Sequence, residues 1–142
     1  MSSEENERKR YLKWAGEYSR AAKMALDSKL APQVIGHLNW VGVELSLKAL
    51  AVGHTMPQDH DLDAGTNHLL GNHCVTHQEY ANELKPLYAH ITGSAASYSE
   101  ARYPGKNPGY WDNVTSEQLE HALDAGSSVH EFVKKKLNIS VP

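Results

Sequence analysis

Residues 32–53 read PQVIGHLNWVGVELSLKALAVG, and apolar side chains cover almost the whole circumference of a helix built from them. Pro32 suits the first turn of a helix, where a backbone N–H is not needed. The apolar residues form two stripes at helical spacing: Val34, Leu38, Val41, Leu45 and Val52, then Ile35, Val43, Leu47 and Leu50. Only His37, Glu44 and Lys48 make a narrow polar seam. We therefore expect this helix at the centre of the domain, or between the core and another subunit.

The helix before it is amphipathic. The pattern Ser2-x-x-Glu5 is typical of a capping box that opens a helix. Its end is expected near Leu30, because Pro32 disfavours helical geometry in the residue before it. The predicted core face consists of Tyr11, Trp14, Ala15, Tyr18, Ala22, Ala25 and Leu26. The predicted outward side chains are Arg8, Lys13, Glu17, Arg20, Lys23 and Asp27.

The chain after residue 53 is predicted to continue with helices. A loop is expected over 54–66 and a short helical turn over 67–72. Thr76-x-x-Glu79 is a second capping box, which opens a helix that ends at Arg102. A kink is expected at Pro86 within that helix. Its core face is predicted to hold Tyr80, Leu84, Leu87, Tyr88, Ile91, Ala95 and Tyr98.

The last helix follows a second loop. Pro104-Gly105 and Asn107-Pro108-Gly109 predict that loop, with Tyr110 and Trp111 as its anchors. Thr115-x-x-Gln118 opens the helix, and the lysines at 134–136 suit the negative end of its dipole. No stretch of useful length alternates between apolar and polar residues with the period of two that is typical of a β-strand. The sequence therefore predicts a single all-α domain over residues 1–142, an up-and-down bundle of four long helices plus a short helical turn.

Composition limits the possible functions. The chain has 142 residues and a formal net charge of −3, from 14 Lys and Arg against 17 Asp and Glu. A dedicated nucleic-acid binder is usually strongly basic, so any RNA contact must depend on a local cluster. The polar start MSSEENERKR and the lack of a long apolar run predict neither a signal peptide nor a membrane span. With its single cysteine, Cys74, the chain is expected to be cytoplasmic.

Several short motifs, in this order, resemble the HEPN domain (higher eukaryotes and prokaryotes nucleotide-binding). They are Trp14-x-x-x-Tyr18, VELSLKAL at 43–50, Arg102-Tyr103-Pro104 and Phe132-Val133-Lys134. The family's loop histidine corresponds to His60 or His68. We prefer His68, because Ala64-Gly65-Thr66 makes a poor helix after His60.

The resemblance implies a dimer with a cleft that binds nucleotide or RNA. Catalytic members carry Arg-x4–6-His, and no arginine in this sequence has a histidine at that distance. The resemblance therefore implies binding without RNA cleavage. We also expect a homodimer that forms through the apolar surface of the helix at 32–53 and its neighbours.

Arg102 and Tyr103 are the candidate ligand-binding pair. A guanidinium binds phosphate with two hydrogen bonds, and a phenol stacks on bases. Lys48, His68 and Lys106 are candidate neighbours in the same site. The alternative is structural: Arg102 caps the end of its helix or pairs with a carboxylate.

Histidines are unusually frequent, with nine in the chain. The region with His60, His68, His73, Cys74 and His77 invites a metal interpretation, but these spacings do not match a common zinc motif. We therefore predict neither a metal site nor a cofactor. Cys74 has histidines on both sides, but nothing in the sequence supplies an orienting carboxylate for a nucleophile.

The leading functional hypothesis is a non-catalytic HEPN-type module. It binds a nucleotide, RNA or a partner protein, which in this family is often encoded nearby, at a cleft near Arg102 and Tyr103. One alternative is a ribonuclease or toxin, paired with an antitoxin, that uses Arg102 and His68 in an atypical site. The other alternative is a purely structural assembly domain.

Overall fold

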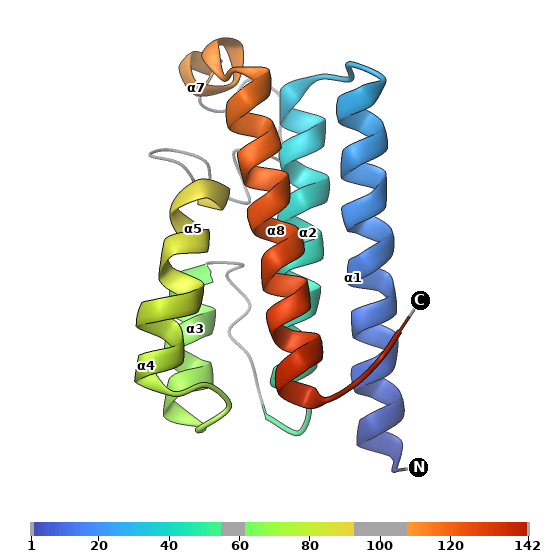
Figure 1. Cartoon of the computed structure of the whole chain (residues 1–142), viewed down its shortest axis with the longest axis vertical. Coiled ribbons are helices and arrows are strands. Elements are labelled where there is room, and N and C mark those ends of the chain that lie inside the picture. The colour runs from blue at the N-terminus through green and yellow to red at the C-terminus, as the bar shows by residue number, and fades with distance from the viewer. Residues whose placement is uncertain (1, 55–61, 93–107, 142) are drawn as a thin grey trace.

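A computed structural model describes residues 2–54, 62–92 and 108–141, and every regular element in these ranges is helical (Figure 1). The elements are α1 (Ser3–Asp27), α2 (Pro32–Leu50), α3 (Leu62–Gly71), α4 (His77–Glu79), the π-helical segment η1 (Tyr80–Leu84), α5 (Lys85–Thr92), α7 (Pro108–Asn113) and α8 (Ser116–Leu137). The all-α prediction is confirmed for the described residues. Among the helices in these ranges, none combines the length and apolarity that crossing a bilayer requires.

The long helices α1, α2 and α8 lie side by side (Figure 1). Helix α2 packs against both of the others, and α5 packs on α8. The second apolar stripe of α2, which includes Ile35, Val43 and Leu47, is buried, as predicted for a central helix. The first stripe is more open, because Val34 is 45% exposed and Val41 is only half-buried.

The helix starts predicted at Ser2, Thr76 and Thr115 are confirmed, and both bonds of the capping box are present at Thr76 and Thr115. The Ser2 hydroxyl accepts a hydrogen bond from the Glu5 N–H at 3.1 Å. Thr76 and Glu79 form a full capping box, with backbone-to-side-chain distances of 2.9 and 3.0 Å. Thr115 and Gln118 form another, at 2.8 and 3.1 Å. These side chains satisfy N–H groups that a helix start otherwise leaves unpaired.

Two predicted loops contain helices instead. Helix α3 begins at Leu62, although the sequence predicted a loop to residue 66. Leu62, Thr66 and Leu69 recur at helical spacing and are all buried, so packing outweighs the low helix propensity of Gly65. The reason given for preferring His68 over His60 is therefore wrong, because Ala64-Gly65-Thr66 is helical.

The second such helix is α7, which begins inside the predicted loop and includes its predicted anchors, Tyr110 and Trp111. It begins at Pro108, a residue that the first helical position accepts. Trp111 is buried as the predicted anchor, and its ring packs so closely on Gly36 of α2 that a larger side chain there would clash. Glycine at position 36 thus lets α7 close one end of the molecule.

The sequence predicted a kink at Pro86, and the structure has a π-helical segment, Tyr80–Leu84, shortly before this residue. Proline has no N–H, so the usual bond to the carbonyl of Asn82 cannot form. Just before it, the Lys85 N–H donates to the Tyr80 carbonyl, five residues back. The predicted continuation of this helix to Arg102 lies outside the described residues.

The predicted faces of α1 need two corrections. Trp14, predicted in the core, is 52% exposed. Arg8, predicted outside, points inward and donates from Nη1 to the Ala49 carbonyl at 2.6 Å and from Nη2 to the Val52 carbonyl at 3.2 Å. Arg8 lies one turn before Leu12 on the buried face of α1, where the carbonyls at the end of α2 need donors.

A seam of small and polar side chains joins α1, α2 and α8. The Asn39 amide donates to the Ala122 carbonyl at 2.9 Å, and the hydroxyls of Ser19 and Ser127 lie 3.2 Å apart. His130 is 9% exposed, and its Nε2 lies 2.9 Å from the Leu12 carbonyl. Because a carbonyl can only accept, Nε2 carries the proton and donates it.

This position of His130 predicts that acid weakens the fold. Burial lowers the pKa of His130 below its ordinary value of 6.5, although the hydrogen bond to Leu12 opposes this shift. The unfolded state therefore binds a proton more readily, so stability is lost as the pH falls through about 6.5. Urea unfolding at pH 7.5 and 5.5 should show a smaller pH effect for His130→Gln than for the unmodified protein. An equal pH effect in both would contradict this role.

Candidate functional site

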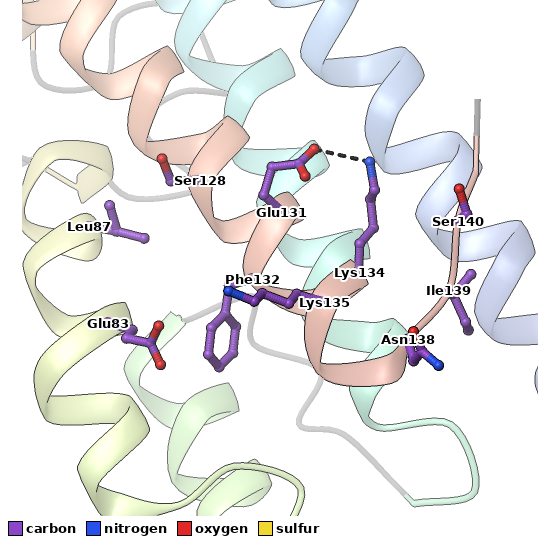
Figure 2. Close-up of a pocket in the computed structure, with 10 residues that line it drawn as sticks. All are labelled: Glu83, Leu87, Ser128, Glu131, Phe132, Lys134, Lys135, Asn138, Ile139 and Ser140. Atoms are coloured by element: carbon purple, nitrogen blue, oxygen red, sulfur yellow. Dashed lines mark hydrogen bonds and ion pairs between the residues drawn. The ribbon is translucent and has the colours of Figure 1, made fainter.

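An open groove of about 670 Å³ lies on the outer face of α8 (Figure 2). The C-terminal half of α8 forms its floor, η1 and α5 supply one side, and the tail after α8 supplies the other. The lining residues are Glu83, Leu87, Ser128, Glu131, Phe132, Lys134, Lys135, Asn138, Ile139 and Ser140.

Helical spacing brings the floor residues together. Ser128, Glu131, Lys135 and Asn138 recur every three or four residues and so share one side of α8. Asn138 then ends the helix in a left-handed conformation with φ of 54°. The Ile139 N–H donates back to the Lys134 carbonyl at 3.0 Å, and the Ile139 side chain is buried. This cap holds the tail in place as a wall of the groove.

The opposite wall depends on η1. Leu84 is fully buried and anchors η1 to the core, while its neighbour Glu83 is exposed toward the groove. Leu87 follows in α5 and lies half-buried beside Phe132 in the lining. An extra residue in a π-helical turn rotates the side chains that follow it, and such turns are frequent at functional sites.

The groove combines an apolar centre with opposite charges. Leu87 and Phe132 provide the apolar surface (Figure 2). The Lys134 ammonium is already paired with the Glu131 carboxylate at 3.0 Å. Neither Glu83 nor Lys135 has an ion-pair partner among the residues that the structure describes, so one free charge of each sign borders the groove.

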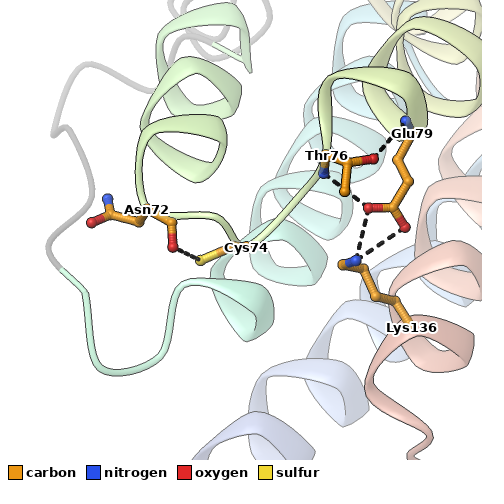
Figure 3. Close-up of polar contacts among 5 residues, drawn as sticks. All are labelled: Asn72, Cys74, Thr76, Glu79 and Lys136. Carbon is orange, nitrogen blue, oxygen red and sulfur yellow. Dashed lines mark hydrogen bonds and ion pairs between the residues drawn. The ribbon is translucent and has the colours of Figure 1, made fainter.

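A clamp between α4 and α8 supports this arrangement (Figure 3). The Lys136 ammonium donates to both carboxylate oxygens of Glu79, at 2.8 and 3.0 Å. The same carboxylate accepts from the Thr76 N–H. Partial burial acts to raise the pKa of Glu79, but the hydrogen bonds from Lys136 and Thr76 outweigh it and lower the pKa. Glu79 therefore stays ionised and ties the start of α4 to the end of α8.

Cys74 lies close to this clamp (Figure 3). Its thiol is half-buried and makes a weak contact of 3.9 Å with the Asn72 carbonyl. Burial raises the pKa of the Cys74 thiol, although the positive charges of Arg8 and Lys136 oppose the shift. A raised pKa favours the thiol over the reactive thiolate. This environment fits a structural cysteine better than a nucleophile.

The predicted ligand-binding residues are only partly within the described chain. Lys48 lies in the last turn of α2 and His68 lies in α3; both are half-buried. No hydrogen bond or ion pair joins these two side chains in the described part, and neither lines the groove. Arg102, Tyr103 and Lys106 lie outside the described residues, as does His60. The site predicted around Arg102 stays a prediction.

His73 and His77, the other histidines of the region that invited a metal interpretation, lie in different elements. His73 adopts a left-handed conformation in the turn after α3, and His77 is the first residue of α4. Within the described ranges, no three His, Cys, Asp or Glu side chains gather closely enough to hold a metal ion.

The sequence reasoning missed the groove. The sequence pattern that could have indicated the groove is the spacing of polar residues on the outer side of the last helix, next to the lysines at 134–136. That spacing is also typical of an ordinary solvated face, so only the packing of η1 and the tail reveals a recess.

Comparisons with protein-family models, with curated proteins and with solved structures find no match for this chain.

Proposed function

We propose that this protein is a non-catalytic helical module that binds a segment of a partner protein in the groove along α8. The observation that carries the proposal is an apolar centre at Phe132 and Leu87 bordered by the unpaired charges of Glu83 and Lys135. The volume of the groove, about 670 Å³, falls within the usual range of ligand-binding sites.

The chemistry of the groove favours a peptide over a nucleotide. An apolar side chain of the partner can pack on Phe132, while its basic and acidic groups pair with Glu83 and Lys135. A nucleotide carries several negative charges, which the carboxylate of Glu83, unpaired among the described residues, repels. Lys134 offers little compensation, because Glu131 already neutralises it.

The HEPN-like up-and-down bundle predicted from the sequence is kept as part of this proposal. The order of the motifs that end at Phe132-Val133-Lys134 supports it. Of the ligands predicted from the sequence, the partner protein is the one that we propose to bind in the groove. A nucleotide or RNA site at Arg102 and Tyr103, with Lys48, His68 and Lys106, is a separate hypothesis with its own test.

Peptide selection followed by affinity measurement tests the groove. Peptides selected from a displayed random library on the immobilised protein should carry an apolar residue flanked by opposite charges. In fluorescence anisotropy, Glu83→Lys and Lys135→Glu should each weaken the binding of such a peptide about tenfold, because each reverses a charge at the rim. Glu120→Lys, an exposed change on α8 outside the groove, is the matched control. Peptides that bind all four proteins equally would overturn the proposal.

Titration with ATP and with a short oligouridylate separates the alternative. ATP at millimolar or RNA at micromolar concentration is tested against the unmodified protein, Lys135→Glu and Arg102→Ala. Equal binding to the first two proteins and none to Arg102→Ala would support the site at Arg102 instead. The groove proposal predicts no such binding that depends on Lys135.

A further inference from the structure

Large apolar side chains are exposed on one part of the molecule. Among the described residues, the strongly exposed ones are Trp14, Met24, Leu30 and Val34. All of them belong to α1, to the turn after it or to the first turn of α2. Met24 is 68% exposed and Trp14 52%. Clustered exposed apolar groups on a soluble domain mark surfaces that contact another protein.

The outward side of α1 has the pattern of an interface helix. Glu7, Arg10, Trp14, Glu17 and Met24 recur every three, four or seven residues, so they share one side of the helix. A hollow of about 140 Å³ lies beside the Trp14 indole, lined by Glu7, Arg10, Tyr11 and Trp14. It offers room for a side chain of a facing protein.

The charges around Trp14 on one copy of α1 complement those on a second copy of the same helix. Arg10 lies four residues before Trp14 and Glu17 lies three residues after it. Neither forms an ion pair within the part of the chain that the structure describes. Helix α1 therefore presents an apolar centre with a cation on one side and an anion on the other.

We propose that the outward face of α1 is the contact surface for a second copy of this chain. In a two-fold symmetric pair with antiparallel α1 helices centred on Trp14, Arg10 of each subunit faces Glu17 of the partner subunit. The symmetry forms the same pair twice, as an isologous interface requires. The two indoles meet at the axis, where burial of a large aromatic contributes most to binding.

This surface differs from the predicted one, which was centred on the helix at 32–53. Val41 and Leu45 of α2 are half-buried within the protomer, whereas Trp14 and Met24 extend into solvent. Among the described residues, the two most exposed large apolar side chains thus lie on α1. The inference does not depend on the groove of α8, because none of its residues lines that groove.

Sedimentation equilibrium of the full chain tests the proposal. The unmodified protein should form a dimer, and Trp14→Ser should weaken the dimer at least about tenfold. Arg10→Glu and Glu17→Arg should each weaken it about tenfold, because like charges then face each other. The double variant Arg10→Glu/Glu17→Arg should restore much of the affinity, since the reversed pair forms again across the axis.

Lys23→Glu, an exposed change on another side of α1, is the matched charge control. Circular dichroism of each variant checks that the helices are retained. A protein that stays monomeric at millimolar concentration overturns the proposal. A dimer that is insensitive to Trp14→Ser, or charge reversals that the double variant does not rescue, also overturns it.

Discussion

Replacing Leu84 with alanine is expected to lower the free energy of unfolding by about 3 kcal/mol, within a range of about 2–5 kcal/mol. Leu84 is 0% exposed and belongs to the main core cluster. It is also the buried residue of η1, so its truncation leaves a cavity where η1 meets the core. The midpoint and slope of urea unfolding measure the change.

Lys85→Ala is the matched control, because Lys85 is exposed and follows Leu84 directly. That change should stay within about 0.5 kcal/mol. Selected peptides should also bind the Leu84→Ala protein more weakly than the control, since Leu84 anchors the wall that carries Glu83. A loss below about 1 kcal/mol would show that η1 is not packed as described.

Replacing Arg8 with alanine is expected to lower the free energy of unfolding by about 2 kcal/mol. The guanidinium donates to the carbonyls of Ala49, Leu50 and Val52, at 2.6, 3.3 and 3.2 Å. Its removal leaves the partly buried end of α2 without these donors. Thermal or urea unfolding of the purified variant measures the loss.

Arg8→Lys separates charge from hydrogen-bond geometry. Lysine keeps the cation but lacks the fork that reaches several carbonyls at once, so an intermediate loss is expected. Lys13→Ala, an exposed change on the same helix, should have little effect. Equal stability of the Arg8→Ala and Lys13→Ala proteins would contradict the capping role of Arg8.

The sequence predicted those parts of the fold that depend on neighbouring residues. Capping boxes at Thr76 and Thr115 fixed two helix starts, because the partners of each lie three residues apart. The disturbance near Pro86 follows from the missing N–H of proline. The buried stripe of α2 followed from helical spacing alone.

The errors arose where distant packing decides. Trp14 has a core-like position in the pattern of α1 but is 52% exposed. Arg8 looks like a surface residue until the end of α2 arrives beside it. Helix α3 includes Gly65 because Thr66 is buried against Tyr88, with their hydroxyl oxygens 2.6 Å apart.

The candidate site was beyond sequence reasoning for the same reason. Glu83 and Lys135 are 52 residues apart in the chain and line the same groove because α5, which follows η1, packs on α8. From the sequence, Phe132 was predicted to belong to the apolar stripe of the last helix and to a family-like motif, and not to a groove. The residues favoured from the sequence, Arg102, Tyr103 and Lys106, lie outside the described ranges.

Amide chemical shifts of the ¹⁵N-labelled protein, recorded during titration with a selected peptide, test the proposed function most directly. The account predicts the largest changes at Leu87, Ser128, Phe132 and Lys135, which line the groove. It also predicts that these changes vanish in the double variant Glu83→Lys/Lys135→Glu. Changes confined to α1, or unaffected by that double variant, would contradict a peptide-binding groove along α8.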